Sequence, residues 1–182
     1  MNKMEWGSGM PSGEPQGRVE RHTIAVLVDN EPGVLARVIG LFAGRGYNID
    51  SLTVTEVSHE ANESRITIVT TGSPEIIDQI KSQLGRLVPV HMVTDLTVKG
   101  DPIERELALV KVAGKGEKRV ESLRLSEAFR AQVVDATTDH FVFEITGRIS
   151  KIENFIALMK PLGLVEVART GAAAIARGPE AM

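Results

Sequence analysis

The chain has 182 residues, a formal net charge of −3 and no cysteine. The lack of cysteine excludes disulfides, thiolate-ligated zinc, iron–sulfur clusters and thiol catalysis. The mildly acidic charge argues against a broad basic face for binding a nucleic-acid backbone. Aromatic residues make up only 4%, so the core must be built from aliphatic side chains and methionine.

The N-terminal stretch "MNKMEWGSGMPSGEPQGRVE" is rich in glycine, proline and serine and lacks the apolar core of a secretory signal. We expect residues 1–20 to be a disordered tail, in which Trp6 has no assigned role. No run approaches the roughly 18 apolar residues that a membrane-spanning helix needs. We therefore expect a cytoplasmic protein.

Residues 21–98 contain six segments with the periodicity of strands or helices. "HTIAVLVD" is apolar and β-branched, as in strands, whereas "EPGVLARVIGLFAGRG" carries apolar residues at helical spacing. A second helix is expected to begin with Ser73 as its N-cap and Pro74 at its first position. The expected order is strand 22–29, helix 31–46, strand 47–57, strand 64–71, helix 73–87 and strand 88–98.

This order, βαββαβ, predicts an α+β domain of the ferredoxin-like type. Right-handed crossover connections would give an antiparallel four-stranded sheet with both helices on one face. The opposite face of that sheet must then be solvated, or covered by another domain or subunit.

The same order of elements recurs after "KGDP" at 99–102, which we expect to be a linker. We expect a second ferredoxin-like βαββαβ domain over 103–178 and a tail over 179–182. By composition alone, the whole ending "GAAAIARGPEAM", residues 171–182, is typical of a short tail. The expected elements are strand 103–114, helix 117–131, strands 132–137 and 140–147, helix 150–163 and strand 164–170.

The two helices of the second domain differ in their apolar faces. Helix 117–131 has an irregular face of Val120, Leu123 and Phe129. Helix 150–163 has a capping box formed by Ser150 and Glu153. Its apolar stripe is regular and consists of Ile152, Phe155, Ile156, Met159 and Leu162.

No motif in the sequence points to catalysis by this chain. The four histidines are scattered, and none has a second histidine or a carboxylate at the spacing of metal ligands. "GKGEK" at 114–118 lacks the spacing of a phosphate-binding loop. No Ser-His-Asp set and no dinucleotide-binding glycine fingerprint occurs. We therefore expect no catalytic residues, no metal site and no cofactor in this chain.

The turn "VDNEPGVL" at 28–35 could bind an anion, because the start of a helix exposes unpaired N–H groups and a partial positive charge. Asn30 is expected to cap the helix, and Gly33 would let a ligand approach the backbone closely. With Asn48 and an apolar fringe, the turn would suit an α-amino acid that has an aliphatic side chain. The plain alternative is a turn with a capping asparagine and a hinge glycine. The fringe consists of Val34, Leu35 and Ile49.

"VLVDNEPGVLARVIGLFAGRGYNIDSLTV" resembles the opening of an ACT domain, a βαββαβ module that binds amino acids. An ordered series of segments resembles the small regulatory subunits of acetolactate (acetohydroxyacid) synthase, from about Thr23 to Gly178. The series is "NEPGVLARVIGLFAGRGYNIDSLTV", "SRITIVTTG", "QLGRLVPVHMVTDLT", "ERELALVKV" and "GLVEVARTG".

The resemblance implies a subunit of the branched-chain amino acid pathway without an active site of its own. It would bind and activate a catalytic subunit, a transferase that carries thiamine diphosphate, FAD and Mg, and confer feedback inhibition by valine. Two ACT domains would pair side by side, with valine at the dimer interface. By motif position, Asn30, Gly33 and Asn48 would bind valine, and Val34, Leu35 and Ile49 would line the pocket.

Two other functions remain open at this point. A free-standing ACT-type amino-acid sensor would share the first domain and need no large subunit. An RNA-binding ferredoxin-like module is disfavoured by the acidic balance and by the lack of paired aromatic residues for stacking bases. The chain has a single tyrosine.

Overall fold

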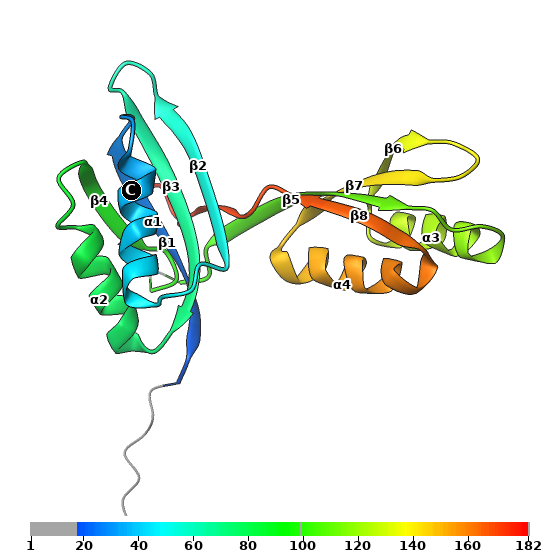
Figure 1. Cartoon of the computed structure of the whole chain (residues 1–182), viewed down its shortest axis with the longest axis horizontal. Helices are drawn as coiled ribbons and strands as arrows, with labels where there is room; N and C mark the ends of the chain where they lie inside the picture. Colours follow the sequence, from blue (N-terminus) through cyan, green and yellow to red (C-terminus); the bar gives the residue numbers. More distant parts are fainter. Residues whose placement is uncertain (1–17, 99, 182) are drawn as a thin grey trace, which may run out of the picture.

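A computed structural model describes residues 18–98 and 100–181 and contains two domains (Figure 1). The expected tail over residues 1–20 lies almost wholly outside the described residues. The first domain comprises β1 (Glu20–Asp29), α1 (Val34–Arg45), β2 (Ser51–Ser58), β3 (Glu63–Gly72), α2 (Pro74–Leu84) and β4 (Val90–Asp95). Its strands form one antiparallel sheet in the order β2-β3-β1-β4, with both helices on one face, which confirms the ferredoxin-like prediction.

The core of the first domain lies between its helices and the sheet. Alternate residues of β1 point into it, as the two-residue period of a strand requires. Each large aliphatic side chain that is fully buried stabilises the fold by about 1.5–3 kcal/mol. The buried cluster consists of Ile24, Val26, Val28, Val34, Val38, Phe42, Ile66, Ile68, Ile77, Ile80 and Leu84.

The end of α1 explains why β2 begins at Ser51 rather than at residue 47 as expected. Gly46 adopts φ 69°, a left-handed conformation that glycine reaches without steric cost. The N–H groups of Gly46 and Tyr47 donate to the carbonyls of Ala43 and Phe42 and close the helix. Residues 46 and 47 therefore belong to the cap of α1 and not to the next strand.

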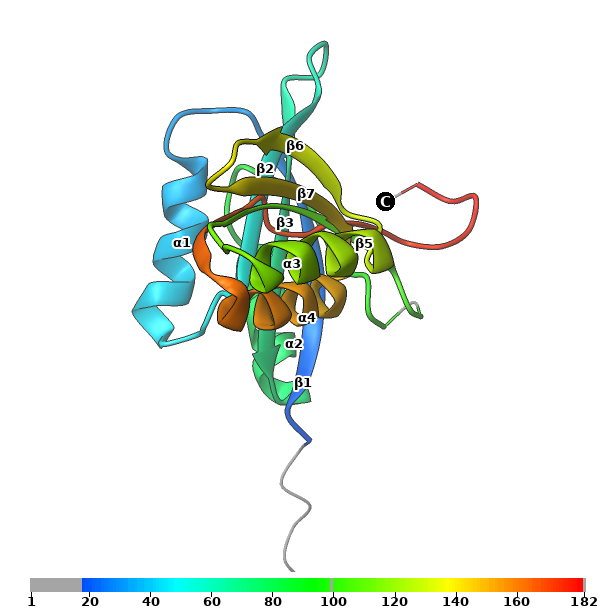
Figure 2. The same ribbon diagram turned by 90° about the vertical axis from the view of Figure 1, so that its right-hand side faces the viewer.

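The second domain repeats the same topology. It comprises β5 (Ile103–Val112), α3 (Glu117–Ala128), β6 (Gln132–Ala136), β7 (Phe141–Gly147), α4 (Ile149–Met159), the 3-10 turn η1 (Lys160–Leu162), β8 (Leu164–Arg169) and β9 (Ala173–Ile175). Its main strands are ordered β6-β7-β5-β8. Figure 2 shows α3 and α4 together on one side of this sheet.

The two helices of the second domain differ from the sequence-based predictions of their apolar face and of their N-terminal cap. On α3, Val120 and Leu123 of the expected apolar face are exposed, whereas Phe129 packs against the core. The fully buried positions of the helix are Ser122 and Ser126. Each serine hydroxyl donates to the carbonyl three residues earlier, so its burial leaves no unpaired donor.

The N-terminus of α4 also differs from the prediction. The helix begins at Ile149 with Arg148 in the N-cap position, and no side chain in the described part of the protein makes a capping hydrogen bond there. Ser150 is the second helical residue, so the prediction of a capping box formed by Ser150 and Glu153 was wrong. The apolar stripe is confirmed, because Ile152, Phe155 and Met159 are buried in the core of the second domain.

The chain returns to the first domain after β8, along residues 170–176, which we call the return segment (Figure 1). Within it, β9 pairs with the first residues of β5. Ala174 is buried against Ala25 and Leu96, on the face of the first sheet that its helices leave open. The return segment therefore covers part of that face, and the expectation of a tail was wrong for residues 173–175. No helix in the described part of the chain is long and apolar enough to cross a membrane.

Candidate functional site

A tight turn separates β1 from α1. Gly33 has φ 88° and ψ −8°, and the N–H of Val34 lies 3.4 Å from the carbonyl oxygen of Glu31. With Pro32 before it, Gly33 occupies the third position of a type II turn, which requires positive φ. Helix α1 consequently begins at Val34 with Gly33 as its N-cap. The expectation that Asn30 caps the helix was wrong, because the turn lies between them.

This turn is open to solvent. Asn30, Gly33 and Leu35 are all exposed, and a Cβ built on Gly33 would meet no atom within 4 Å. The backbone N–H of Asn30 donates to the carbonyl of Asn62 in the β2–β3 loop at 2.7 Å, which fixes the turn against the sheet. Val34 differs from its neighbours, because its side chain is buried in the core and not on the exposed surface.

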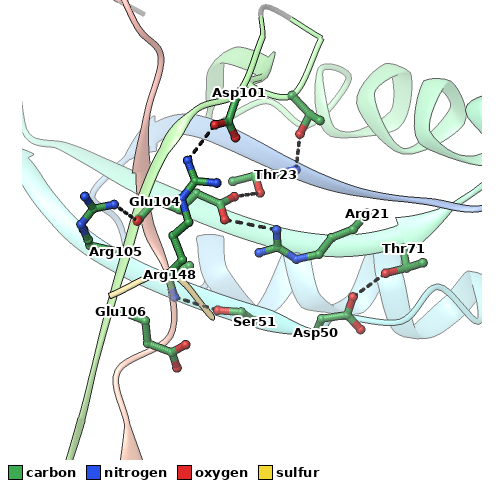
Figure 3. A network of polar contacts seen from close by, with 12 residues as sticks. Arg21, Thr23, Asp50, Ser51, Thr71, Asp101, Glu104, Arg105, Glu106 and Arg148 are labelled. Carbon is green, nitrogen blue, oxygen red and sulfur yellow. Dashed lines mark hydrogen bonds and ion pairs between the residues drawn. The ribbon is translucent and has the colours of Figure 1, made fainter. Parts of the chain in front are cut away.

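Asn48 and Ile49 lie at the other end of α1. The side-chain amide of Asn48 donates to Asp50, and its backbone carbonyl accepts a hydrogen bond from the Thr70 hydroxyl at 2.6 Å. Asp50 in turn accepts from Thr71 at 2.7 Å (Figure 3). Ile49 is half-buried against the core of the first domain. The position of Asn48 is thus fixed by bonds on both its side chain and its backbone.

The two sets of predicted site residues are far apart within one chain. Asn48 is adjacent to Thr70, which pairs with His22 near the start of β1, whereas Asn30 follows Asp29 at the end of β1. About seven residues of strand separate the two levels, which corresponds to roughly 20 Å along the sheet. One chain therefore holds two halves of the predicted site, Asn30 to Leu35 and Asn48 to Ile49, and does not bring them together.

The Asn48 half faces the second domain across a cleft of about 730 Å³. Asn48, Ile49 and Ser51 line one wall, and Arg169 and Gly171 line the other. A ligand or partner group that contacts Asn48 would thus lie next to the start of the return segment.

Charged side chains connect the two domains beside this cleft (Figure 3). Glu104 of β5 accepts hydrogen bonds from Arg21 and Thr23 of β1. Arg148 donates to Asp101 at 2.7 Å, and this hydrogen bond, with the positive charge, lowers the pKa of the Asp101 carboxyl. The contacts of Glu104 hold the start of β5 against the first domain, whereas the Arg148–Asp101 pair joins the linker to the start of α4.

A second ion pair lies within the second domain, where Arg169 donates two hydrogen bonds of 2.7 Å to Glu106. The side chain of Glu106 is only 3% exposed, and the hydrogen bond raises the pKa of Arg169. Glu104 and Glu106 were not among the site residues predicted from the sequence. A signal was present, since both are carboxylates in the strand "IERELALVKV", whose other residues are apolar apart from Arg105 and Lys111.

Each histidine forms a pair with a carboxylate, which the spacing in the sequence did not reveal. Asp29 and His91 lie 2.6 Å apart directly before the turn at Asn30. The other pairs are His22–Asp95, His59–Glu56 and His140–Asp135. Within residues 18–98 and 100–181, no three or more histidine and acidic side chains are grouped so as to hold a metal ion.

Comparison with known proteins gives a consistent result for both domains. Residues 24–92 match the family model of the AHAS small subunit-like ACT domain, and residues 105–178 match that of the small subunit of acetolactate synthase. The chain is 46% identical over 158 residues to a probable acetolactate synthase small subunit of Archaeoglobus fulgidus, covering 87% of this chain and 98% of the relative. It is 41% identical over 163 residues to the isozyme 3 small subunit of Escherichia coli, covering 89% and 99%.

A solved structure agrees with these relatives. The acetolactate synthase small subunit from Thermotoga maritima superposes with a TM-score of 0.79 at 39% identity, covering 88% of this chain and 99% of that chain. The identity, the coverage and the two matched models place all described elements in one family. The chain belongs to the family of acetolactate synthase small subunits.

Proposed function

We propose that this chain is the regulatory subunit of an acetolactate synthase, that it binds and activates the catalytic subunit, and that it confers inhibition by valine. The observation that carries the proposal is the division of the predicted effector site into two halves about 20 Å apart, one at the exposed turn and one at the cleft beside the second domain. A site of this kind needs a second chain to complete it, as an effector site at a dimer interface would.

The topology supports such pairing, because β2 is an edge strand of the first sheet. An isologous contact between two β2 edges would run the strands antiparallel and make one continuous sheet. The start of β2 in one copy would then lie opposite the end of β2 in the other. Because Asn48 precedes the start of β2 and Asn62 follows its end, Asn48 of one copy would approach the turn of its partner.

The chemistry of the two halves suits a small aliphatic amino acid. The turn would offer main-chain N–H groups to the carboxylate, and glycine at position 33 leaves open space above the backbone. The carboxamides of Asn30 and Asn48 would take the ammonium group. Leu35 and Ile49 would contact the side chain, whereas Val34 would act from within the core beneath the turn.

The chemistry would belong to the catalytic subunit. The catalytic subunit would carry thiamine diphosphate, FAD and Mg, and would supply all of the chemistry in the cytoplasm. This chain would act only through the conformation that it imposes on that subunit. A ligand can shift such an equilibrium by no more than its differential affinity for the two conformations, commonly about 1–3 kcal/mol.

The test is reconstitution from purified subunits. The chain alone should form no acetolactate from pyruvate. Mixed with its cognate large subunit, it should raise the rate of acetolactate formation and make that rate fall on addition of valine. A large subunit whose rate and valine response do not change on addition of this chain would refute the proposal.

A further inference from the structure

The return segment is fixed to both domains by specific hydrogen bonds. At its beginning, the N–H of Thr170 donates to the carbonyl of Leu107 in β5 at 3.0 Å. Two residues later, both backbone groups of Ala172 are bonded to side chains of β2. The Ala172 N–H donates to the Ser51 hydroxyl oxygen at 2.9 Å, and the Ala172 carbonyl accepts from the Thr53 hydroxyl at 2.9 Å.

Gly171 allows this close approach. Its φ of 81° is unfavourable for other residues, and a Cβ at this position would lie 2.8 Å from the Ser51 hydroxyl oxygen and 3.0 Å from the Thr53 methyl group. The backbone of the return segment therefore packs directly on the side chains of β2. Further along, Arg65 of β3 donates to the carbonyl of Ala174 at 2.8 Å. The segment connects β5 of the second domain to β2 and β3 of the first.

The contact at Ala172 lies beside one half of the proposed effector site. Ser51 is three residues after Asn48, and the cleft that Asn48 and Ile49 line also reaches Thr170 and Gly171. The residues between them are held, since the N–H of Asp50 donates to the Val69 carbonyl at 2.8 Å. A displacement of Asn48 by a ligand would thus move the start of β2, and the Ser51 hydroxyl with it.

We propose that Ser51 and Thr53 are positioning residues that transmit effector binding at Asn48 to the second domain through the backbone of Ala172. This inference rests on the proposed function, because it needs an effector that changes the activity of the catalytic subunit. Effector binding at Asn48 and the response of the second domain should in addition be separable by mutation. Without the two hydroxyls, the effector binds as before and the second domain no longer responds.

The test uses the full chain reconstituted with its large subunit. The variant Ser51→Ala/Thr53→Val removes both hydroxyls with little change in volume. The variant Ser51→Thr/Thr53→Ser keeps both hydroxyls and should retain inhibition by valine. Thr55→Val is the matched control, since Thr55 is on the same face of β2 and its hydroxyl, among the described residues, donates a single long hydrogen bond of 3.5 Å to the adjacent Glu56 carbonyl. Calorimetry measures valine affinity, and acetolactate formation measures activation and inhibition.

The Ser51→Ala/Thr53→Val chain should bind valine within about twofold of wild type and should activate the large subunit, while the maximal inhibition by valine falls by at least about half. Full valine inhibition in this variant would overturn the inference and leave the proposed function intact. A wild-type chain that neither binds valine nor confers inhibition would overturn both.

Hydrogen exchange supplies a readout that needs no variant. The Ala172 amide is the donor to Ser51, so its exchange rate reports that contact directly. In the wild-type holoenzyme, saturating valine should change the exchange rate of Ala172 by about threefold or more. An Ala172 amide whose exchange is the same with and without valine would overturn the inference, whether or not the double variant folds.

Discussion

The two ends of α1 lie in different surroundings. At its N-terminal end the Pro32–Gly33 turn is exposed, and the backbone N–H of Asn30 donates to the carbonyl of Asn62 in the β2–β3 loop. At its C-terminal end Asn48 is bonded to Asp50 and Thr70 and faces the second domain across a cleft. The first end is free to contact another chain, whereas the second is connected to the rest of its own chain. We expect substitutions at the first end to affect binding, and those at the second to affect stability and response as well.

The largest effect is expected from Gly33→Asp. The substitution places a negative charge where the proposed site receives a carboxylate, and like charges at close range cost several kcal/mol. Valine affinity measured by calorimetry should fall by at least about 100-fold, while activation of the large subunit persists. Gly33→Asn is the matched control, because it has the same shape and imposes the same strain at φ 88° without the charge. Equal valine affinity in the Gly33→Asp and wild-type chains would remove the turn from the site.

A comparable loss, in stability rather than binding, is expected from Arg169→Met. The change leaves the buried carboxylate of Glu106 without its partner. Because Arg169 itself is about a third exposed, we expect the free energy of unfolding to fall by about 2–3 kcal/mol in urea titrations. Lys111→Met, which breaks the exposed pair with Glu166, should cost less than about 1 kcal/mol. Similar losses in both variants would show that the Glu106 pair is no more important than a surface pair.

Asn48→Ala should have a smaller effect on binding. Loss of one polar contact with the ligand is worth about 0.5–1.5 kcal/mol, which corresponds to a decrease in valine affinity of about two- to tenfold. Asn154→Ala, at an exposed position of α4, is the control and should bind valine normally. If Asn48→Ala binds as tightly as the control, the C-terminal end of α1 does not contribute to the site.

The smallest effect is expected from Asp101→Asn. The hydrogen bond from Arg148 lowers the pKa of Asp101 in the folded chain. The ionised carboxylate therefore stabilises the fold at pH values above the ordinary pKa of an aspartate, and this contribution is lost as the pH falls through the lowered pKa. The difference in unfolding free energy between wild type and Asp101→Asn should be small at pH 7 and vanish in strong acid. High salt should also reduce it, because the pair is exposed. A difference that grows toward acid pH would have the wrong sign.

The order of elements and the cores could be predicted from the sequence, because they depend on local periodicity. The alternation of Ile24, Val26 and Val28 and the stripe of Ile152, Phe155 and Met159 are sufficient to identify a strand and a helix. The residues at which the helices begin were harder to predict. Asn30 and Ser150 have good capping side chains, but Pro32–Gly33 forms a turn of its own and α4 begins earlier, at Ile149.

The return segment could not be predicted from its own residues. "GAAAIA" has low strand propensity, and its conformation depends on pairing with β5 and on the hydroxyls of Ser51 and Thr53. The two hydroxyls are more than a hundred residues away in the chain, and β5 is also distant. The residue types of the candidate site could be read from the sequence, but the separation of its two halves follows only from the register of the sheet.

The central claim is that one effector site combines the turn of one chain with Asn48 of another. The most direct test mixes Gly33→Asp chains with Asn48→Lys chains, neither of which should bind valine tightly alone. If sites are shared across a two-fold interface, each mixed dimer regains one intact site, and about one in four of the wild-type sites should reappear with wild-type affinity in calorimetry. If no tight binding returns after the subunits exchange, each site lies within a single chain and the account is wrong.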